Sequence, residues 1–209
     1  VDVVLLVDTT ASMGGEIQVM RQNLVAFVNG VRQRLPFSDI QFGLVSFKDY
    51  PGRFASCGYD KPYGRLIDSP FTVDAPITAD DQQLLQAVTA LTASGGIDLP
   101  ESYSRALWKV TRPDSGIGFR ANSARFVLLI GDSSPHHCGL EAGLAPCIRP
   151  PPPTGPDLGR DGLLGTGDDI DFQLDTLLAL SASRIPVLMI YSWPTLFCRW
   201  QAWCAFTGG

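Results

Sequence analysis

An aspartate and two hydroxyl residues stand at alternate positions directly after an apolar run near the start of the chain. Residues 3–7 are apolar, and Asp8, Thr10 and Ser12 follow them. A carboxylate and two hydroxyls are hard oxygen ligands, which Mg²⁺ prefers in a near-octahedral arrangement that keeps some water. An ion with one open position could bind a carboxylate of another molecule. The alternative is helix capping by Thr10 or Ser12, which is worth about 1 kcal/mol.

Three further loops carry acidic or hydroxyl residues. They are Lys48-Asp49-Tyr50, the segment 95–101 with Asp98, Pro100 and Glu101, and the segment 131–136 with Asp132 and His136. In open α/β sheets, ligands bind beyond the carboxyl ends of the strands, near the point where the strand order reverses. We expect these loops to meet the first loop there. Four converging loops favour a metal site over simple capping.

The elements that must position these loops alternate between strand and helix patterns. Short apolar runs predict strands at 3–7, 41–47, 125–130 and 186–191. Apolar residues at helical spacing and terminal signals predict helices at 16–35, 80–91, 101–110, 172–183 and 196–206. Segment 53–76 predicts an irregular excursion with a short strand near 71–73. The alternation predicts an α/β fold, namely a doubly wound, mostly parallel sheet flanked by helices on both faces.

The composition is that of a globular protein without nucleic-acid-binding character. The 209 residues fit a single domain, 1–209, with a Pro/Gly/Asp-rich insertion at about 138–169. The charged fraction of 18% and the net charge of −5 argue against disorder and against a nucleic-acid partner. No apolar stretch approaches the roughly 20 residues of a membrane span. The chain starts inside a predicted strand, so we expect any signal peptide to have been removed or left out.

The five cysteines favour an oxidising compartment and therefore an extracellular, cell-surface or periplasmic location. Their odd number predicts at least one thiol that is free or pairs outside the chain. Cys138 and Cys147 are a plausible loop disulfide. Cys198 and Cys204, six apart on one predicted helix, point to different faces and are not expected to pair.

The four loops together resemble those of a von Willebrand factor A-type domain with a metal-ion-dependent adhesion site. Within that superfamily they are most similar to the integrin-β-like branch and to bacterial domains, and we expect a bacterial source. The matching segments are Asp8-x-Thr10-x-Ser12-Met13, Phe47-Lys48-Asp49-Tyr50, Gly95-Gly96-x-Asp98-x-Pro100-Glu101 and Gly131-Asp132-x-x-Pro135-His136. The resemblance covers nearly the whole chain and implies a Rossmann-like fold.

The resemblance also implies ligands, partners and a role. It implies an Mg²⁺ or Mn²⁺ site built by Asp8, Thr10, Ser12, Glu101 and Asp132. It implies an adjacent Ca²⁺ site built by Asp49, Asp98, the Pro100 carbonyl and a bridging Glu101, although the family's Asn of that site falls on Gly96. The implied function is non-enzymatic adhesion to a protein ligand that presents an acidic residue, with other domains in a longer chain.

A second acidic region lies in the insertion. Its Gly-punctuated carboxylates, Asp157, Asp161, Asp168 and Asp169, are typical of a calcium loop, but the regular EF-hand order is missing. A solvated turn region is an equally good interpretation. His136 and His137 near Asp132 could form an acid–base pair, but no nucleophile accompanies them, so a structural role is favoured.

Two other functions stay open at this point. The first is a metal-assisted hydrolase or phosphatase with Asp8 as nucleophile, a class that normally places a second Asp where Thr10 stands. The second is an interaction scaffold with a degenerate metal site. A nucleotide-binding role is weaker, because no Gly-x-Gly-x-x-Gly or Gly-Lys-Ser/Thr motif occurs.

Overall fold

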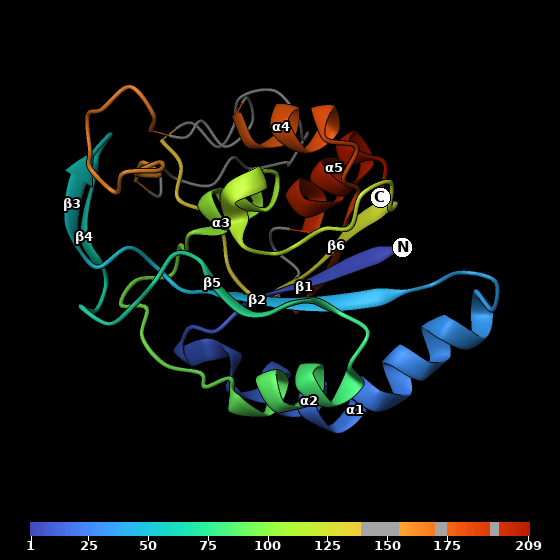
Figure 1. The fold of residues 1–209 in the computed structure, drawn as a ribbon. Helices are drawn as coiled ribbons and strands as arrows, with labels where there is room; N and C mark the ends of the chain where they lie inside the picture. Colours follow the sequence, from blue (N-terminus) through green and yellow to red (C-terminus); the bar gives the residue numbers. More distant parts are fainter. Residues whose placement is uncertain (139–154, 170–174, 193–196) are drawn as a thin grey trace.

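The protein is an α/β structure built on a mixed five-stranded sheet (Figure 1). The computed structural model describes residues 1–138, 155–169, 175–192 and 197–209. The strand order is β5-β2-β1-β6-β7. The strands are β1 (Asp2–Asp8), β2 (Gln41–Phe47), β5 (Thr72–Thr78), β6 (Arg125–Gly131) and β7 (Val187–Tyr191). The predicted strands at 3–7, 41–47, 125–130 and 186–191 are thus confirmed to within a residue or two.

The strand order places β1 at the centre and reverses beside it. β1, β2, β6 and β7 are parallel, and β5 is antiparallel to β2 at one edge. The chain moves outward from β1 to β2 and β5, then returns to β6 on the other side of β1. The loops after β1 and β6 therefore flank the point of reversal, where α/β sheets bind ligands.

Helices cover both faces of the sheet (Figure 1). On one face, α1 (Gly14–Arg34) and α2 (Asp81–Ala90) pack over a core that includes Leu5 and Leu44. On the other face lie α3 (Tyr103–Val110), α4 (Leu177–Ala182) and α5 (Phe197–Thr207). This arrangement is compatible with a Rossmann-like fold. None of the described helices is long and apolar enough to cross a membrane.

The aromatic side chains of α5 belong to the second core. Trp200 and Trp203 are each only 2% exposed and pack with Tyr103 and other buried residues above the sheet. Part of the predicted helix 172–183 falls outside the described residues, and α4 forms its later half.

The segment predicted to be irregular contains a hairpin that the sequence did not reveal. β3 (Gly52–Ser56) and β4 (Tyr59–Gly64) pair antiparallel around Cys57 and Gly58. Both turn residues have positive φ, 46° and 83°, as the tight two-residue turns of hairpins require. The strand predicted near 71–73 is the longer β5.

A disulfide fastens this hairpin to the loop that follows β6. Cys57 and Cys138 are bonded across 81 residues of sequence, with Cα atoms 5.6 Å apart. The predicted Cys138–Cys147 disulfide is therefore wrong, because the hairpin turn carries Cys57 back to Cys138. Cys198 is also disulfide-bonded, and Cys204 is a free thiol, as the odd cysteine count predicts.

Candidate metal-binding site

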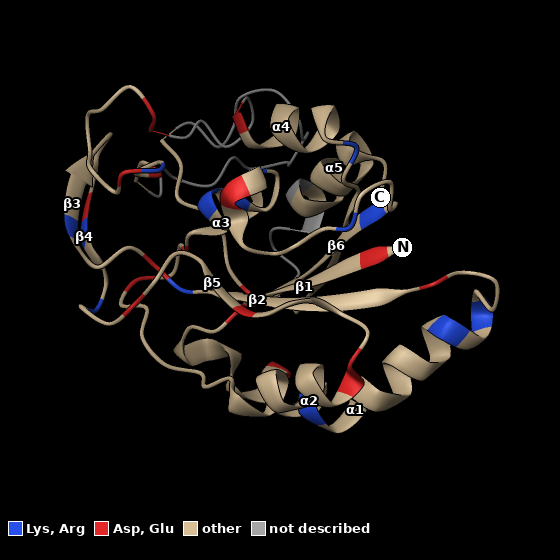
Figure 2. Ribbon diagram, viewed as in Figure 1, with Lys and Arg blue, Asp and Glu red and all other residues tan. Residues whose placement is uncertain are grey.

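The carboxyl-end edge of the parallel strands brings the predicted loops together around one pocket. β1 ends at Asp8, and Asp132 follows the end of β6 directly. Acidic segments gather in the loops beyond this end of the sheet, on the side of the β3–β4 hairpin (Figure 2). The pocket has a volume of about 100 Å³, and its polar lining includes Thr10, Ser12, Asp98, Glu101 and Asp132.

Asp8 lies fully buried at the base of this arrangement. Its Oδ1 accepts hydrogen bonds from the Thr10 amide (2.9 Å) and the Thr10 hydroxyl (2.7 Å). Its Oδ2 accepts from the Tyr103 hydroxyl at 2.7 Å. Burial raises the pKa of Asp8 to about 6, and the nearby charge of Asp132 acts in the same direction.

The hydroxyls of Thr10 and Ser12 face each other rather than capping a helix. Their oxygens are 3.5 Å apart. Thr10 precedes a short 3₁₀ turn (Ala11–Met13) without making a side-chain cap hydrogen bond, and the N-cap of α1 is Met13. The capping alternative for these two residues is therefore wrong, and their hydroxyls are available to the pocket.

Three carboxylates contribute buried oxygens that have no hydrogen-bond partner. These atoms are Oε2 of Glu101, Oδ1 of Asp132 and Oδ1 of Asp98. Glu101 is 3% exposed and Asp132 is 8% exposed. Burial raises the pKa of Glu101 well above its usual range, reinforced by the charges of nearby carboxylates, and burial also raises the pKa of Asp132. A buried carboxylate without a partner is costly, and a bound cation would offset that cost.

The glycine at position 96 lets the third loop approach the first. Gly96 has φ 59°, and a Cβ placed there would lie 2.8 Å from Oε1 of Glu101 and 3.1 Å from Cβ of Thr10. The Asn that the resemblance places at this position would fit only if the Glu101 carboxylate moved away. The same glycine therefore removes one predicted calcium ligand and lets the third loop pack closely against Glu101 and Thr10.

Asp68 holds this loop in place and was missed by the sequence interpretation. It is 5% exposed, and its Oδ2 accepts hydrogen bonds from the Gly96 amide (3.0 Å) and the Arg65 amide (2.7 Å). A Cβ on Gly95 would lie 1.9 Å from Asp68 Oδ1. Asp68 follows no strand and carries no motif, so no local sequence signal marks it.

Lys48 was quoted in a predicted loop but given no role. Its ammonium donates hydrogen bonds to the backbone carbonyls of Thr9, Thr92 (3.2 Å) and Ser94 (2.6 Å). Burial lowers the pKa of Lys48, although the neighbouring carboxylates Asp68, Asp8 and Glu101 oppose this shift. Lys48 therefore ties the first loop to the segment that leads into Gly95.

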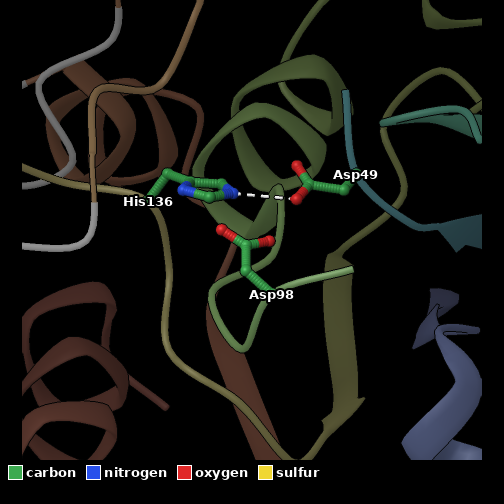
Figure 3. A group of neighbouring side chains, drawn as sticks. All are labelled: Asp49, Asp98 and His136. Atoms are coloured by element: carbon green, nitrogen blue, oxygen red, sulfur yellow. Dashed lines mark hydrogen bonds and ion pairs between the residues drawn. The ribbon is translucent and has the colours of Figure 1, made fainter. Parts of the chain in front are cut away.

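A second group of possible ligands adjoins this pocket and contains Asp49, Asp98 and His136 (Figure 3). One ligand atom from each lies within 4.8 Å of the others. Nε2 of His136 is 2.9 Å from Oδ2 of Asp49, and both side chains are fully buried. Burial raises the pKa of Asp98 to about 7, an effect that the charge of His136 opposes.

Hydrogen bonds and ring stacking orient each member of this group. Oδ1 of Asp49 accepts from the Tyr50 amide (2.7 Å) and the Ser102 hydroxyl (2.9 Å). The Tyr59 hydroxyl donates to Oδ2 of Asp98 at 2.6 Å. The imidazole of His136 stacks on the Tyr63 ring with centroids 3.7 Å apart.

The predicted second site is only partly reproduced by this grouping. The structure brings Asp49 and Asp98 together, and both charges raise the pKa of Glu101, the predicted bridge. Pro100 is buried beside Glu101. His136 joins them as a neighbour that the sequence interpretation treated as purely structural. The only sequence signal for this role of His136 was its position four residues after Asp132. The assignment of Ca²⁺ to this site stays a prediction.

The carboxylates of the predicted calcium loop all have hydrogen-bond partners. Asp157 is 1% exposed and accepts from the Tyr50 hydroxyl at 2.7 Å. Asp161, Asp168 and Asp169 accept from backbone amides at 2.8, 2.9 and 3.1 Å. Within the described part of the chain, neither these four residues nor Asp8, Glu101 and Asp132 of the pocket form a group of three or more His, Cys, Asp or Glu ligands. Calcium binding by this loop stays a prediction.

Comparisons with known proteins agree with the resemblance of the loops at low identity. The chain is 24% identical over 187 residues to integrin beta-6 of sheep (Ovis aries) and of cattle (Bos taurus). The match covers 85% of this chain but only 22% of each relative. No family model matches the chain. The similarity is thus to one part of much longer proteins, and nothing in it supports a bacterial source.

Proposed function

We propose that this chain is a divalent-cation-dependent binding module that grips a carboxylate of a protein partner. The observation that carries the proposal is the pair of buried, partnerless oxygens on Glu101 and Asp132 in one small pocket. The other oxygens of these carboxylates contact the Thr10 and Ser12 hydroxyls, and a cation in the pocket would compensate the two oxygens that remain without a partner. Thr10, Ser12, Glu101 and Asp132 line the pocket and would hold the ion, and Asp8 would support it through its hydrogen bonds to Thr10.

The donor set favours Mg²⁺ or Mn²⁺ in this pocket. All of the donors are hard oxygens, and a pocket of about 100 Å³ has room for an ion with some of its water. Two of the donors, Thr10 and Ser12, are neutral hydroxyls, so the ion would keep part of its positive charge. Ser12 is exposed, so this side of the pocket is where a partner's carboxylate would enter.

Each chain residue around the ion has a separate task in this proposal. Asp8 orients the Thr10 hydroxyl, Asp68 holds the Gly95–Gly96 turn, and Lys48 ties the first loop to the third. These contacts hold the pocket in one conformation before a ligand binds. A partner would therefore bind with little loss of conformational entropy in these loops.

We further propose that the fold is the doubly wound arrangement of von Willebrand factor A-type domains, within a longer extracellular chain. The reversal of strand order beside β1 supports the fold, and the Cys57–Cys138 disulfide supports an oxidising location. The similarity to integrin beta-6 over 22% of its length supports a place among other domains.

A non-enzymatic role is part of the proposal. Asp8 is fully buried and accepts hydrogen bonds on both oxygens, so it is poorly presented as a nucleophile. Thr10 stands where a phosphatase of that type places its acid–base carboxylate. We expect a broad phosphatase screen with Mg²⁺ to give no turnover.

Calorimetric titration with Mg²⁺ and Mn²⁺ tests the site. We expect one ion to bind the wild type, and affinity to fall by about 100-fold or more in Asp8→Ala. Ser12→Ala should also weaken binding, and because Ser12 is exposed this loss cannot be attributed to misfolding. Asp161→Ala is the matched control outside the pocket. Equal affinities in the wild type and Asp8→Ala would contradict the assignment.

Ligand capture tests the function itself. Immobilised protein is incubated with short peptides that contain one Asp, and with matched peptides that contain Asn. We expect retention of Asp peptides in Mg²⁺, loss of retention in EDTA, and no retention by Ser12→Ala. Retention that is indifferent to EDTA would count against a metal-bridged carboxylate.

A further inference from the structure

We infer that Asp49, Asp98 and His136 form a second site for a transition-metal ion of the zinc class, and not for calcium. The inference does not depend on the ion proposed for the first pocket, because neither Asp49 nor His136 is among the ligands proposed there. It departs from the sequence prediction, which expected oxygen ligands for Ca²⁺ at this place.

The spacing of the three ligand atoms suits a small ion. The possible ligand atoms lie within 4.8 Å of one another, and Nε2 of His136 is 2.9 Å from Oδ2 of Asp49. In a tetrahedral zinc site with bonds of 2.0–2.2 Å, neighbouring ligand atoms stand about 3.3 Å apart. Small side-chain movements therefore suffice to bring all three atoms to bonding distance.

The chemistry of the donors selects the class of ion. Ca²⁺ takes six to eight oxygen ligands and has little use for an imidazole nitrogen, whereas zinc and its neighbours bind imidazole and carboxylate together. Two aspartates and one histidine leave a fourth position open, as in zinc sites with three protein ligands.

Neighbouring groups hold these ligands as metal ligands are usually held. The Ser102 hydroxyl and the Tyr50 amide both bind Oδ1 of Asp49, which leaves Oδ2 directed at His136. The stacked Tyr63 ring fixes the plane of the imidazole. Such outer contacts fix the orientation of ligands and raise metal affinity.

One atom of the group, on a residue that also lines the first pocket, has no hydrogen-bond partner. Oδ1 of Asp98 is buried and has no hydrogen-bond partner, while its other oxygen is held by Tyr59. The three ligands come from three separate loops, and Cys57–Cys138 fastens the His136 loop to the hairpin that carries Tyr59 and Tyr63. The site is thus constrained from several directions before any ion binds.

Zinc titration of matched variants tests the inference. All proteins carry Cys204→Ser, because this free thiol is a competing zinc ligand. The chain has two histidines, so His137→Gln is the natural control for His136→Gln. We expect Zn²⁺ affinity to fall about 100-fold in His136→Gln and to stay unchanged in His137→Gln. Asp98→Asn should also weaken Zn²⁺ binding, and far-ultraviolet circular dichroism of every variant reports that it remains folded.

The outcomes separate this inference from the proposed function. If Asp132→Asn loses Mg²⁺ binding but keeps Zn²⁺ binding, the two sites are distinct and the inference is supported. If Zn²⁺ affinity is the same in wild type and His136→Gln, or if His137→Gln lowers it equally, the inference is overturned. It is also overturned if Ca²⁺ binds the wild type more tightly than Zn²⁺ and Asp98→Asn abolishes that binding.

Discussion

Carboxylates gather in two regions of this molecule, and the two regions treat them in opposite ways. In the pocket at the sheet edge, Glu101 and Asp132 keep buried oxygens without partners. In the loop 157–169, Asp161 and Asp168 accept backbone hydrogen bonds and lie closer to solvent. Burial raises the pKa of Glu101, whereas the Thr166 hydroxyl and Arg160 lower the pKa of Asp168 to about 2. Asp157, at the buried start of the loop, resembles the pocket in this respect, because burial raises its pKa to about 6.

The difference teaches how to separate a ligand-binding acidic cluster from a structural one. A loop that satisfies its own carboxylates with backbone amides is complete without an ion. A pocket that buries carboxylates and leaves one oxygen of each without a donor would be stabilised by a bound cation. Counting acidic residues in the sequence treats both regions alike, so the comparison depends on the hydrogen-bond partners.

The substitution with the largest expected effect is Glu101→Gln in the pocket. Removing one buried negative charge should weaken Mg²⁺ binding by about 100-fold, measured by calorimetry. The same change should raise the free energy of unfolding of the ion-free protein at pH 8, by about 1 kcal/mol, because the uncompensated charge is gone. The opposite signs of the two effects distinguish a ligand from a structural residue. An unchanged Mg²⁺ affinity would show that the pocket carboxylates do not bind an ion and would remove the contrast with the loop 157–169.

The next effect concerns pH. Asp8 and Asp98 have pKa values raised to about 6 and about 7, against about 4 in an unfolded chain. Between about pH 4 and pH 7 the native state therefore binds more protons than the unfolded state. The free energy of unfolding of the ion-free protein should fall as the pH rises through this range, and then level off. Saturating Mg²⁺ should reduce this fall. Urea unfolding across this range, with EDTA or Mg²⁺, measures both curves, and a rise in EDTA would contradict the expectation.

A smaller effect is expected for Gly96→Ala. Gly96 and Gly58 both have positive φ, 59° and 83°, but only Gly96 lies against Glu101 and Thr10. Both alanine variants should lose about 1 kcal/mol of stability from backbone strain. Only Gly96→Ala should also lose Mg²⁺ affinity, by roughly 10-fold. Equal Mg²⁺ affinities in the two variants would show that the close approach has no role in binding.

The smallest effects are expected for substitutions in the loop 157–169. Asp168→Asn should leave Mg²⁺ affinity unchanged and lower the melting temperature slightly at neutral pH. Because the pKa of Asp168 is lowered to about 2, its contribution is present above about pH 4 and fades as pH falls toward 2. Melting curves at pH 7 and pH 3 check this. A Ca²⁺-dependent stabilisation that Asp168→Asn removes would support the predicted calcium loop and would blur the contrast between the regions.

The sequence predicts most of the strands and the loops of the site because both depend on local patterns. β1 and β2 are buried along nearly their whole length, so their apolar runs are almost continuous. Asp8 ends β1, Asp132 follows β6, and Asp98 and Glu101 lie in the loop before α3, so the loops that carry them meet at the same edge of the sheet.

The features that the sequence does not predict depend on contacts between distant segments. Asp68 acts through the amide of Gly96, which is 28 residues away, and His136 meets Asp49 across 87 residues. The Cys57–Cys138 pairing follows from a hairpin whose turn residues, Cys and Gly, are an uncommon turn signal. Periodicity and spacing contain no information on contacts between segments that are far apart in the sequence.

The Cys57–Cys138 disulfide has a consequence for the denatured chain. It closes a covalent ring, and cross-linking residues 81 apart removes chain entropy worth about 4–5 kcal/mol in the polymer picture. Inside that ring lie Asp98, Glu101, Asp132 and His136, whereas Asp8 and Asp49 precede it. An oxidised chain that has lost its fold would still keep the ring members within short reach of one another. Refolding would then have to return β1 and β2, which precede the ring, and α4, β7 and α5, which follow it. A reducing environment would remove the cross-link.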